Sequence, residues 1–127
     1  MILIRRWTIL GIVAGGAIFA QSAGIKRTLV KTQDVSGGHE AVIASVTIAP
    51  GGSARRHTHP GEEISYVIEG EGEILIDGQP PLHIKAGDGY VVPAGAIHDA
   101  HNTGNVPIKL AAVYYLEKGK PFATPAK

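Results

Sequence analysis

Turn-forming residues interrupt this chain at short, even intervals, and this spacing limits the possible folds more than any other feature. The segments between these breaks are short, and none after residue 25 has a sustained helical periodicity. Seventeen glycines and eight prolines in 127 residues suit many strands joined by tight turns. The breaks fall at residues 50–52, 70–72, 77–78, 86–89 and 93–95. We therefore expect an all-β fold.

The apolar segments have the composition and alternation of strands. In residues 41–48, apolar Val42, Ala44, Val46 and Ile48 alternate with a somewhat more polar set. The Asp77-Gly78 pair predicts a hairpin turn, because both residue types accept positive φ. Strands at this spacing predict a sandwich or a barrel, and a closed barrel would leave no exposed strand edges. The expected strands are residues 41–48, 64–69, 73–77, 82–85, 90–92 and 106–116.

The first 24 residues differ from the rest. Arg5 and Arg6 precede an uncharged run over residues 7–20, and small residues follow. This run is short for a membrane span, which needs roughly 20 apolar residues. We interpret residues 1–24 as a signal peptide and residues 25–127 as one folded domain in the periplasm or outside the cell. The alternative is an uncleaved membrane anchor with the domain facing the periplasm. The Arg5-Arg6 pair weakly resembles a twin-arginine signal, so the export route stays open.

The charge and the missing cysteines exclude several functions. The formal net charge is +1, and loss of the two leader arginines would leave −1. A nearly neutral domain gives no electrostatic reason to expect a nucleic acid partner, or membrane contact beyond the leader. The chain has no cysteine, which excludes disulfides, thiolate metal ligands and a cysteine nucleophile.

Three histidines and a glutamate have the spacing of a metal site. His57 and His59 are two residues apart, so on a strand their side chains share one face. Glu63 has the same parity and follows the turn-prone Pro60-Gly61 pair. A fourth ligand must come from elsewhere, and His98, after its own turn, is the natural candidate. Three imidazoles and one carboxylate suit one divalent transition metal, Fe, Mn, Ni, Cu, Co or Zn, rather than calcium or magnesium.

Around these residues the sequence resembles the cupin superfamily, which has the motifs G-x5-H-x-H-x3-E-x6-G and G-x5-P-x-G-x2-H-x3-N. The resemblance extends over roughly residues 41–116. It implies a small single-domain antiparallel jelly-roll β-barrel with a metal inside, bound by His57, His59, Glu63 and His98. It also implies a homodimer, because small cupins often pair through sheet edges. The matching positions are Gly51, His57, His59, Glu63, Gly70, Gly87, Pro93, Gly95, His98 and Asn102, of which Asn102 is not normally a ligand.

Other polar residues near the motifs receive weaker predictions. Glu62 has the wrong parity to replace Glu63, so we expect it in solvent or paired with Arg55 or Arg56. The two arginines could attract an anionic substrate or simply form a solvated turn. His101 differs in parity from His98, which favours a surface or supporting role over a proton shuttle.

The tyrosines are less well constrained. Tyr66 and Tyr90 are expected on the barrel exterior or at a subunit contact. Tyr114 and Tyr115 must face opposite sides of a strand, so one of them could line the cavity.

The expected metal site suggests the class of ligand. Four protein ligands leave about two open positions on an octahedral ion. One carboxylate leaves the centre with a net positive charge, which favours a small anionic chelating molecule. The resemblance implies dioxygenases, decarboxylases, isomerases, lyases and non-catalytic binders alike. We expect a metal-dependent, dioxygenase-like enzyme. The alternatives are a metal-dependent isomerase, lyase or decarboxylase, or a metal or small-molecule binding or sensor protein. No general acid or base stands out, although Glu63 could leave the metal and act as a base.

Overall fold

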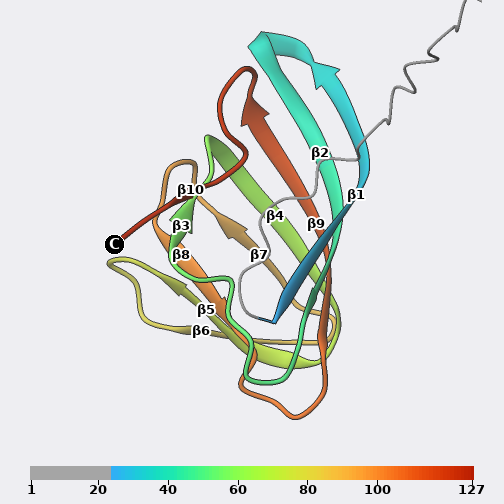
Figure 1. Ribbon diagram of the computed structural model, residues 1–127, viewed down its shortest axis with the longest axis vertical. Coiled ribbons are helices and arrows are strands. Elements are labelled where there is room, and N and C mark those ends of the chain that lie inside the picture. Colours follow the sequence, from blue (N-terminus) through green and yellow to red (C-terminus); the bar gives the residue numbers. More distant parts are fainter. Residues whose placement is uncertain (1–23) are drawn as a thin grey trace, which may run out of the picture.

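The computed structural model describes residues 24–127 (Figure 1). The predicted leader lies outside these residues, apart from Gly24. Within residues 24–127, no helix is long and apolar enough to cross a membrane.

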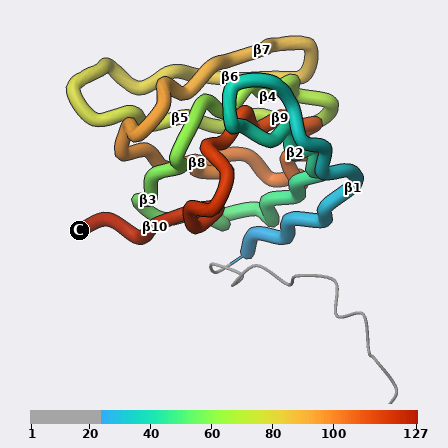
Figure 2. Tube along the Cα trace, turned by 90° about the horizontal axis from the view of Figure 1, so that it is seen from above, coloured from blue at the N-terminus to red at the C-terminus, as the bar shows by residue number. Residues whose placement is uncertain are grey.

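The described residues form two five-stranded antiparallel sheets (Figure 1). One sheet has the order β1-β2-β9-β4-β7, and the other has the order β10-β3-β8-β5-β6. Both views place β10, near the C-terminus, beside β3 (Figures 1 and 2). The elements are β1 (Ile25–Val35), a 3-10 turn (Ser36–Gly38), β2 (His39–Ile48), β3 (His57–Thr58), β4 (Gly61–Glu69), β5 (Glu71–Ile76), β6 (Leu82–Lys85), β7 (Gly89–Val92), β8 (His98–His101), β9 (Ile108–Glu117) and β10 (Thr124–Pro125).

The core lies between the two sheets. In β9, every second residue from Ile108 to Leu116 is buried, and the residues between them are more exposed. The same alternation buries Val42, Ala44, Val46 and Ile48 of β2. Each fully buried aliphatic side chain stabilises the fold by about 1.5–3 kcal/mol. The all-β jelly-roll expectation is confirmed.

The two sheets face each other without closing into one hydrogen-bonded barrel. Among the described residues, no ladder joins a strand of one sheet to a strand of the other. The expected loss of all sheet edges is therefore not observed, since β1 and β7 bound one sheet and β10 and β6 bound the other.

Four strands were not predicted, and each has a physical reason. β1 is an edge strand rich in lysine, threonine and other polar residues, so it lacks the apolar alternation of an inner strand. β3 and β10 have two residues each, too few for a periodic signal. β8 has the sequence His-Asp-Ala-His, which hides its strand character. The predicted break at residues 70–72 is also shorter than expected, because only Gly70 separates β4 from β5.

Candidate metal centre

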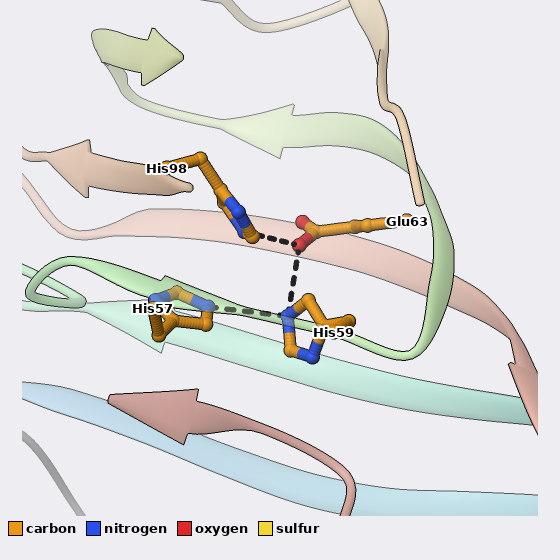
Figure 3. Close-up of side chains that lie close together, drawn as sticks. All are labelled: His57, His59, Glu63 and His98. Carbon is orange, nitrogen blue, oxygen red and sulfur yellow. Dashed lines mark hydrogen bonds and ion pairs between the residues drawn. The ribbon is translucent and has the colours of Figure 1, made fainter. Parts of the chain in front are cut away.

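The four predicted ligands come from both sheets and meet between them (Figure 3). His57 is in β3, His59 directly follows β3, and His98 begins β8. His57 and His98 are partners in the β3–β8 ladder, so their rings lie side by side. Glu63 reaches the same point from β4 of the facing sheet. All four side chains are buried.

Two turns set the positions of these residues. The chain reverses at Pro60-Gly61, where β4 runs so close to β9 that a Cβ at Gly61 would overlap the Tyr115 carbonyl. Alternation along β4 then turns Glu63 inward and leaves Glu62 on the outer face. The second turn precedes β8, and its Gly95 amide donates a hydrogen bond of 3.0 Å to the His59 carbonyl. Gly95 has a φ of 71°, which glycine adopts without strain.

The ligand atoms are spaced as a metal ion requires. The Nε2 atoms of His57 and His59 are 3.1 Å apart. Glu63 Oε2 lies 3.3 Å from His98 Nε2 and 3.5 Å from His59 Nε2. One ligand atom from each of the four residues lies within 4.8 Å of the others. An ion bound at about 2.1 Å from each atom would hold neighbouring ligand atoms about 3 Å apart, close to these distances.

Backbone carbonyls fix the tautomer of all three histidines. His57 Nδ1 donates to the Arg55 carbonyl at 2.6 Å, and His98 Nδ1 donates to the Ala96 carbonyl at 3.0 Å. His59 Nδ1 donates to the Phe122 carbonyl at 2.7 Å. Because a carbonyl can only accept, each Nδ1 carries a proton, and Nε2 is the ring atom left to face the centre.

The backbone at Arg55 takes a strained form near this carbonyl. Arg55 has a φ of 60° and is the non-glycine residue with positive φ in the described part of the chain. This conformation is unfavourable for a residue with a Cβ. The Arg55 side chain itself is exposed, and its amide donates to Ser53 Oγ at 2.9 Å. The contribution of Arg55 to the site is therefore its carbonyl oxygen.

Glu63 is held by two hydroxyls on the side away from the histidines. Ser65 Oγ and Tyr90 OH donate to Glu63 Oε1 at 2.9 and 3.1 Å. Oε2 is thereby left to face the imidazoles. Burial raises the pKa of Glu63, but its hydrogen bonds to His59 and His98 and their charge outweigh burial, and the pKa falls well below its usual value.

The charge state of His57 favours a cation at the centre. Burial lowers the pKa of His57 to about 4, and the neighbouring charges of His98, His59 and Arg27 act in the same direction against its hydrogen bond to the Arg55 carbonyl. At neutral pH the ring is therefore uncharged and its Nε2 carries a lone pair. The Nε2 atoms of His57, His59 and His98 and a carboxylate oxygen of Glu63 converge there, a set of donor atoms that suits a cation. The four residues fit a transition metal.

A narrow cavity adjoins the four side chains. About 10 Å³ of it can hold the centre of a water molecule, roughly the room that one water needs. Tyr90, Tyr114 and Arg27 contribute to its lining. Burial, followed by the charge of Glu63, raises the pKa of both tyrosines, so both remain neutral hydroxyls.

The structure corrects one tyrosine prediction and decides another. Tyr90 lines the cavity and is not on the exterior, because it shares the inward face of β7 with Val92. Its contact with Glu63 could not be read from the sequence, since 27 positions separate the two residues. Ser65 could have been found, because it has the parity of Glu63 on the same strand. Tyr114 faces the cavity, and Tyr115 faces outward.

The structure also places Arg56 and His101, two polar residues near the motifs. Arg56 forms a bidentate pair with Asp77 at 2.7 and 2.8 Å, so it does not pair with Glu62 as one alternative held. His101 lies on the outer side of β8, 40% exposed, with its Nε2 2.8 Å from Asp99 Oδ2. This position agrees with a surface role.

Asn102 supports the β8–β9 connection. Its Nδ2 donates to the carbonyls of Ile48 and Val106 at 2.9 and 2.8 Å, and its Oδ1 accepts from the Gly104 amide at 2.9 Å. Asn102 is thus a structural member of the second motif.

Comparison with known proteins agrees with this architecture. Residues 44–114, more than half of the chain, match the family model described as a cupin domain. The chain is a member of the cupin superfamily. This cupin aligns with an uncharacterized conserved protein with a double-stranded β-helix domain from Klebsiella pneumoniae. The TM-score is 0.69 at 24% identity, over 87% of this chain and 90% of that one.

Two relatives of this cupin have named activities. An acireductone dioxygenase of Rhodopseudomonas palustris is 43% identical over 63 residues, which are 47% of this chain and 37% of that protein. The crystal structure of the DMSP lyase DddQ from Ruegeria pomeroyi aligns with a TM-score of 0.60 at 28% identity, over 68% of this chain and 43% of that one. The matches span 21% to 62% of the lengths of the first curated relatives.

Proposed function

We propose that this cupin binds one divalent transition metal through His57, His59, Glu63 and His98 and uses it as a dioxygenase-like enzyme on a small chelating anion. The observation that carries the proposal is the convergence of three Nε2 atoms and one carboxylate oxygen, each residue fixed from behind by a hydrogen bond. Because these hydrogen bonds orient each donor atom toward a common point, little reorganisation would oppose metal binding.

The bound metal would supply Lewis acidity and, with iron, a reaction with O2. The protein residues would hold the ion and restrict what reaches it. The narrow cavity admits only a small ligand, and the buried tyrosine hydroxyls can donate hydrogen bonds to a ligand oxygen. The similarity to an acireductone dioxygenase supports an oxygen-dependent reaction.

Metal analysis and oxygen uptake test this proposal. Protein purified from its native host should contain about one metal per chain. H57A and H98A should lose that metal, while H83A, which changes an exposed histidine, should keep it. The native metalloprotein should consume O2 when it is mixed with enolic, phenolic or hydroxy-acid compounds. A wild-type protein without metal would contradict the proposal.

The second candidate is a reaction without O2, catalysed as an isomerase, lyase or decarboxylase. The similarity to the DMSP lyase favours it. Turnover of a substrate at the same rate under nitrogen would select this candidate. Tight ligand binding without product, in air and with several metals, would instead select a binding or sensor protein.

Export to the periplasm is part of the proposal and rests on the sequence of residues 1–24. Cell fractionation should find the protein in the periplasm, and sequencing of its N-terminus should begin near residue 25. Membrane-bound protein with Met1 intact would indicate the uncleaved anchor. Protein in the cytoplasm would contradict export.

The proposed homodimer has a candidate surface on the outer face of the β1-β2-β9-β4-β7 sheet. Ile43, Val113, Ile64 and Val91 lie side by side in register across β2, β9, β4 and β7. Ile43, Ile64 and Val91 are 41%, 47% and 56% exposed. A continuous apolar row of this kind is typical of an interface, which favours the sheet face over the expected sheet edge. I64E should convert the dimer to a monomer in light scattering and leave the metal content unchanged.

A further inference from the structure

Arg27 places a positive charge in the cavity beside the four convergent side chains. It is in β1, opposite Val46 of β2, and it shares the inner face of the strand with buried Ile25. Arg27 lines the cavity together with His57 and Tyr114. Its charge acts on both residues and lowers the pKa of each, although burial remains the main influence on both. Arg27 is therefore a cavity residue, unlike its exposed neighbour Lys26.

The guanidinium of Arg27 is half-buried and hydrogen-bonds the Tyr114 side chain, but it has no anionic partner among residues 24–127. Its Nε is buried and has no hydrogen-bond partner in the described part of the chain. No carboxylate among residues 24–127 forms an ion pair with it, whereas Arg56 on the surface pairs with both oxygens of Asp77. An unpaired buried donor is costly, and more so on a charged group. An anion that enters the cavity would supply the partner that this donor lacks.

The charges of the centre indicate what kind of anion this is. Glu63 contributes −1, a divalent ion would contribute +2, and Arg27 adds +1, so the loaded centre would have a net charge near +2. A guanidinium binds a carboxylate through two parallel N–H donors, a geometry that a lysine cannot offer. The narrow cavity restricts the ligand to few atoms.

We propose that Arg27 is the anion-binding residue of the cavity and holds a carboxylate of a small carboxylic acid, whose other oxygens face His57, His59, Glu63 and His98. This inference rests on the proposed metal site and names its substrate class. It assigns Arg27 a role in ligand selection and none in metal binding.

Calorimetric titration of the zinc-loaded full chain with oxalate, and with neutral oxamide of the same shape, tests the inference. Zinc content is measured before and after each titration. The wild type should prefer oxalate, and R27Q should bind oxalate about tenfold more weakly or worse while its zinc content is unchanged. R27K keeps the charge without the planar donors and should lie between the two. K26Q removes the same charge from the outer face of β1 and should behave as the wild type.

The outcomes separate this inference from the proposed function. If zinc binds but R27Q and R27K retain the oxalate affinity of the wild type, the inference is wrong and the metal site stands. Zinc binding without any affinity for oxalate also overturns the inference. If the wild type binds no zinc, the proposed function fails, and this inference fails with it. Because R27K preserves size and charge, it provides the test even if R27Q does not fold.

Discussion

At the scale of single residues, the orientation of each ligand depends on a hydrogen bond made by its other polar atom, which faces away from the centre. Each histidine has its Nδ1 occupied by a backbone carbonyl, and Glu63 has its Oε1 occupied by Ser65 and Tyr90. These contacts leave one coordinating atom per residue with a fixed direction. Substitution of a supporting residue should therefore weaken metal binding without removing a ligand.

Tyr90 provides the clearest test of this support. Y90F removes the hydroxyl that donates to Glu63 Oε1 and keeps the ring. The carboxylate keeps only the Ser65 hydroxyl on Oε1 and is held less firmly, so metal affinity should fall about tenfold. Titration against a competing chelator measures the change. Y66F, which alters a tyrosine that is 53% exposed, is the control and should have no effect. Equal affinity of Y90F and wild type would show that Ser65 alone orients Glu63.

The pH dependence of stability should reveal the buried His57. Its folded-state pKa of about 4 lies below the usual histidine value of 6.5, so between these values the unfolded chain binds more protons. The metal-free protein should therefore lose about 3 kcal/mol of stability from this residue as the pH falls from 6.5 to 4. Above pH 6.5 His57 is neutral in both the folded and the unfolded chain, so it no longer changes the free energy of unfolding with pH. Urea unfolding at several pH values measures it.

H57Q is the matched control, because glutamine does not titrate. Its stability should change less than that of the wild type between pH 6.5 and 4. Below pH 4.5 both proteins should lose further stability, since the pKa of Glu63 is also lowered in the fold. Parallel curves for the two proteins would mean that His57 is already protonated in the fold at pH 6.5.

At the scale of elements, the C-terminal segment completes the site from outside the motifs. The Phe122 carbonyl accepts from His59 Nδ1, and the Phe122 ring packs against His59 and Tyr114 with centroid distances of 4.9 and 4.7 Å. β10 follows and pairs with β3, which contains His57. Residues 121–127 thus fix His59 although they lie more than 60 positions away.

Truncation of the C-terminus distinguishes the contribution of Phe122 from that of β10. A chain that ends at Lys120 loses the Phe122 carbonyl and ring, and its metal affinity should fall about 10- to 100-fold. A chain that ends at Thr124 retains Phe122 and should bind metal almost as well as the full chain. Chelator competition measures both. A large loss in the chain that ends at Thr124 would assign the effect to β10 and not to Phe122.

The β8–β9 connection should matter for stability and not for metal binding. N102A removes the donor to the carbonyls of Ile48 and Val106 and the acceptor for the Gly104 amide. These groups would be left without partners, at a cost of about 2–4 kcal/mol. Urea unfolding measures the loss, and N105A at an exposed neighbour should change stability by less than about 0.5 kcal/mol. Loss of metal from folded N102A would contradict this separation of roles.

The elements also show which parts of the fold a sequence can reveal. Inner strands such as β2 and β9 bury every second residue, and their alternation is visible along the chain. β1 is an edge strand whose outer face is polar, so its apolar signal is weak, and the cavity position of Arg27 was missed with it. The four histidine and glutamate positions could be predicted because their spacing is local within each motif. The contacts of Tyr90, Phe122 and Arg27 depend on which strands face each other, and parity cannot supply that information.

At the scale of the whole molecule, the centre lies where the two sheets meet. β3 and β8 bring His57 and His98 from one sheet, His59 follows β3 directly, and β4 brings Glu63 from the other sheet. A metal bound by all four residues would connect the sheets through the core, in addition to the apolar packing around it. Metal binding and folding should therefore be coupled, because the unfolded chain does not hold these residues together.

Thermal unfolding with and without metal tests this coupling. At a free zinc concentration about 1,000 times the dissociation constant, binding should stabilise the fold by about 4 kcal/mol. For a domain of this size, the melting temperature should rise by roughly 15 °C or more, and chelation should reverse the rise. The double variant H57A/H98A has ligands removed from β3 and β8, so zinc should leave its melting temperature unchanged. H39A alters a histidine outside the centre, on β2, and should keep the full shift. An equal shift in H57A/H98A would mean that zinc stabilises the protein at another site, and the four convergent residues would then need a different explanation.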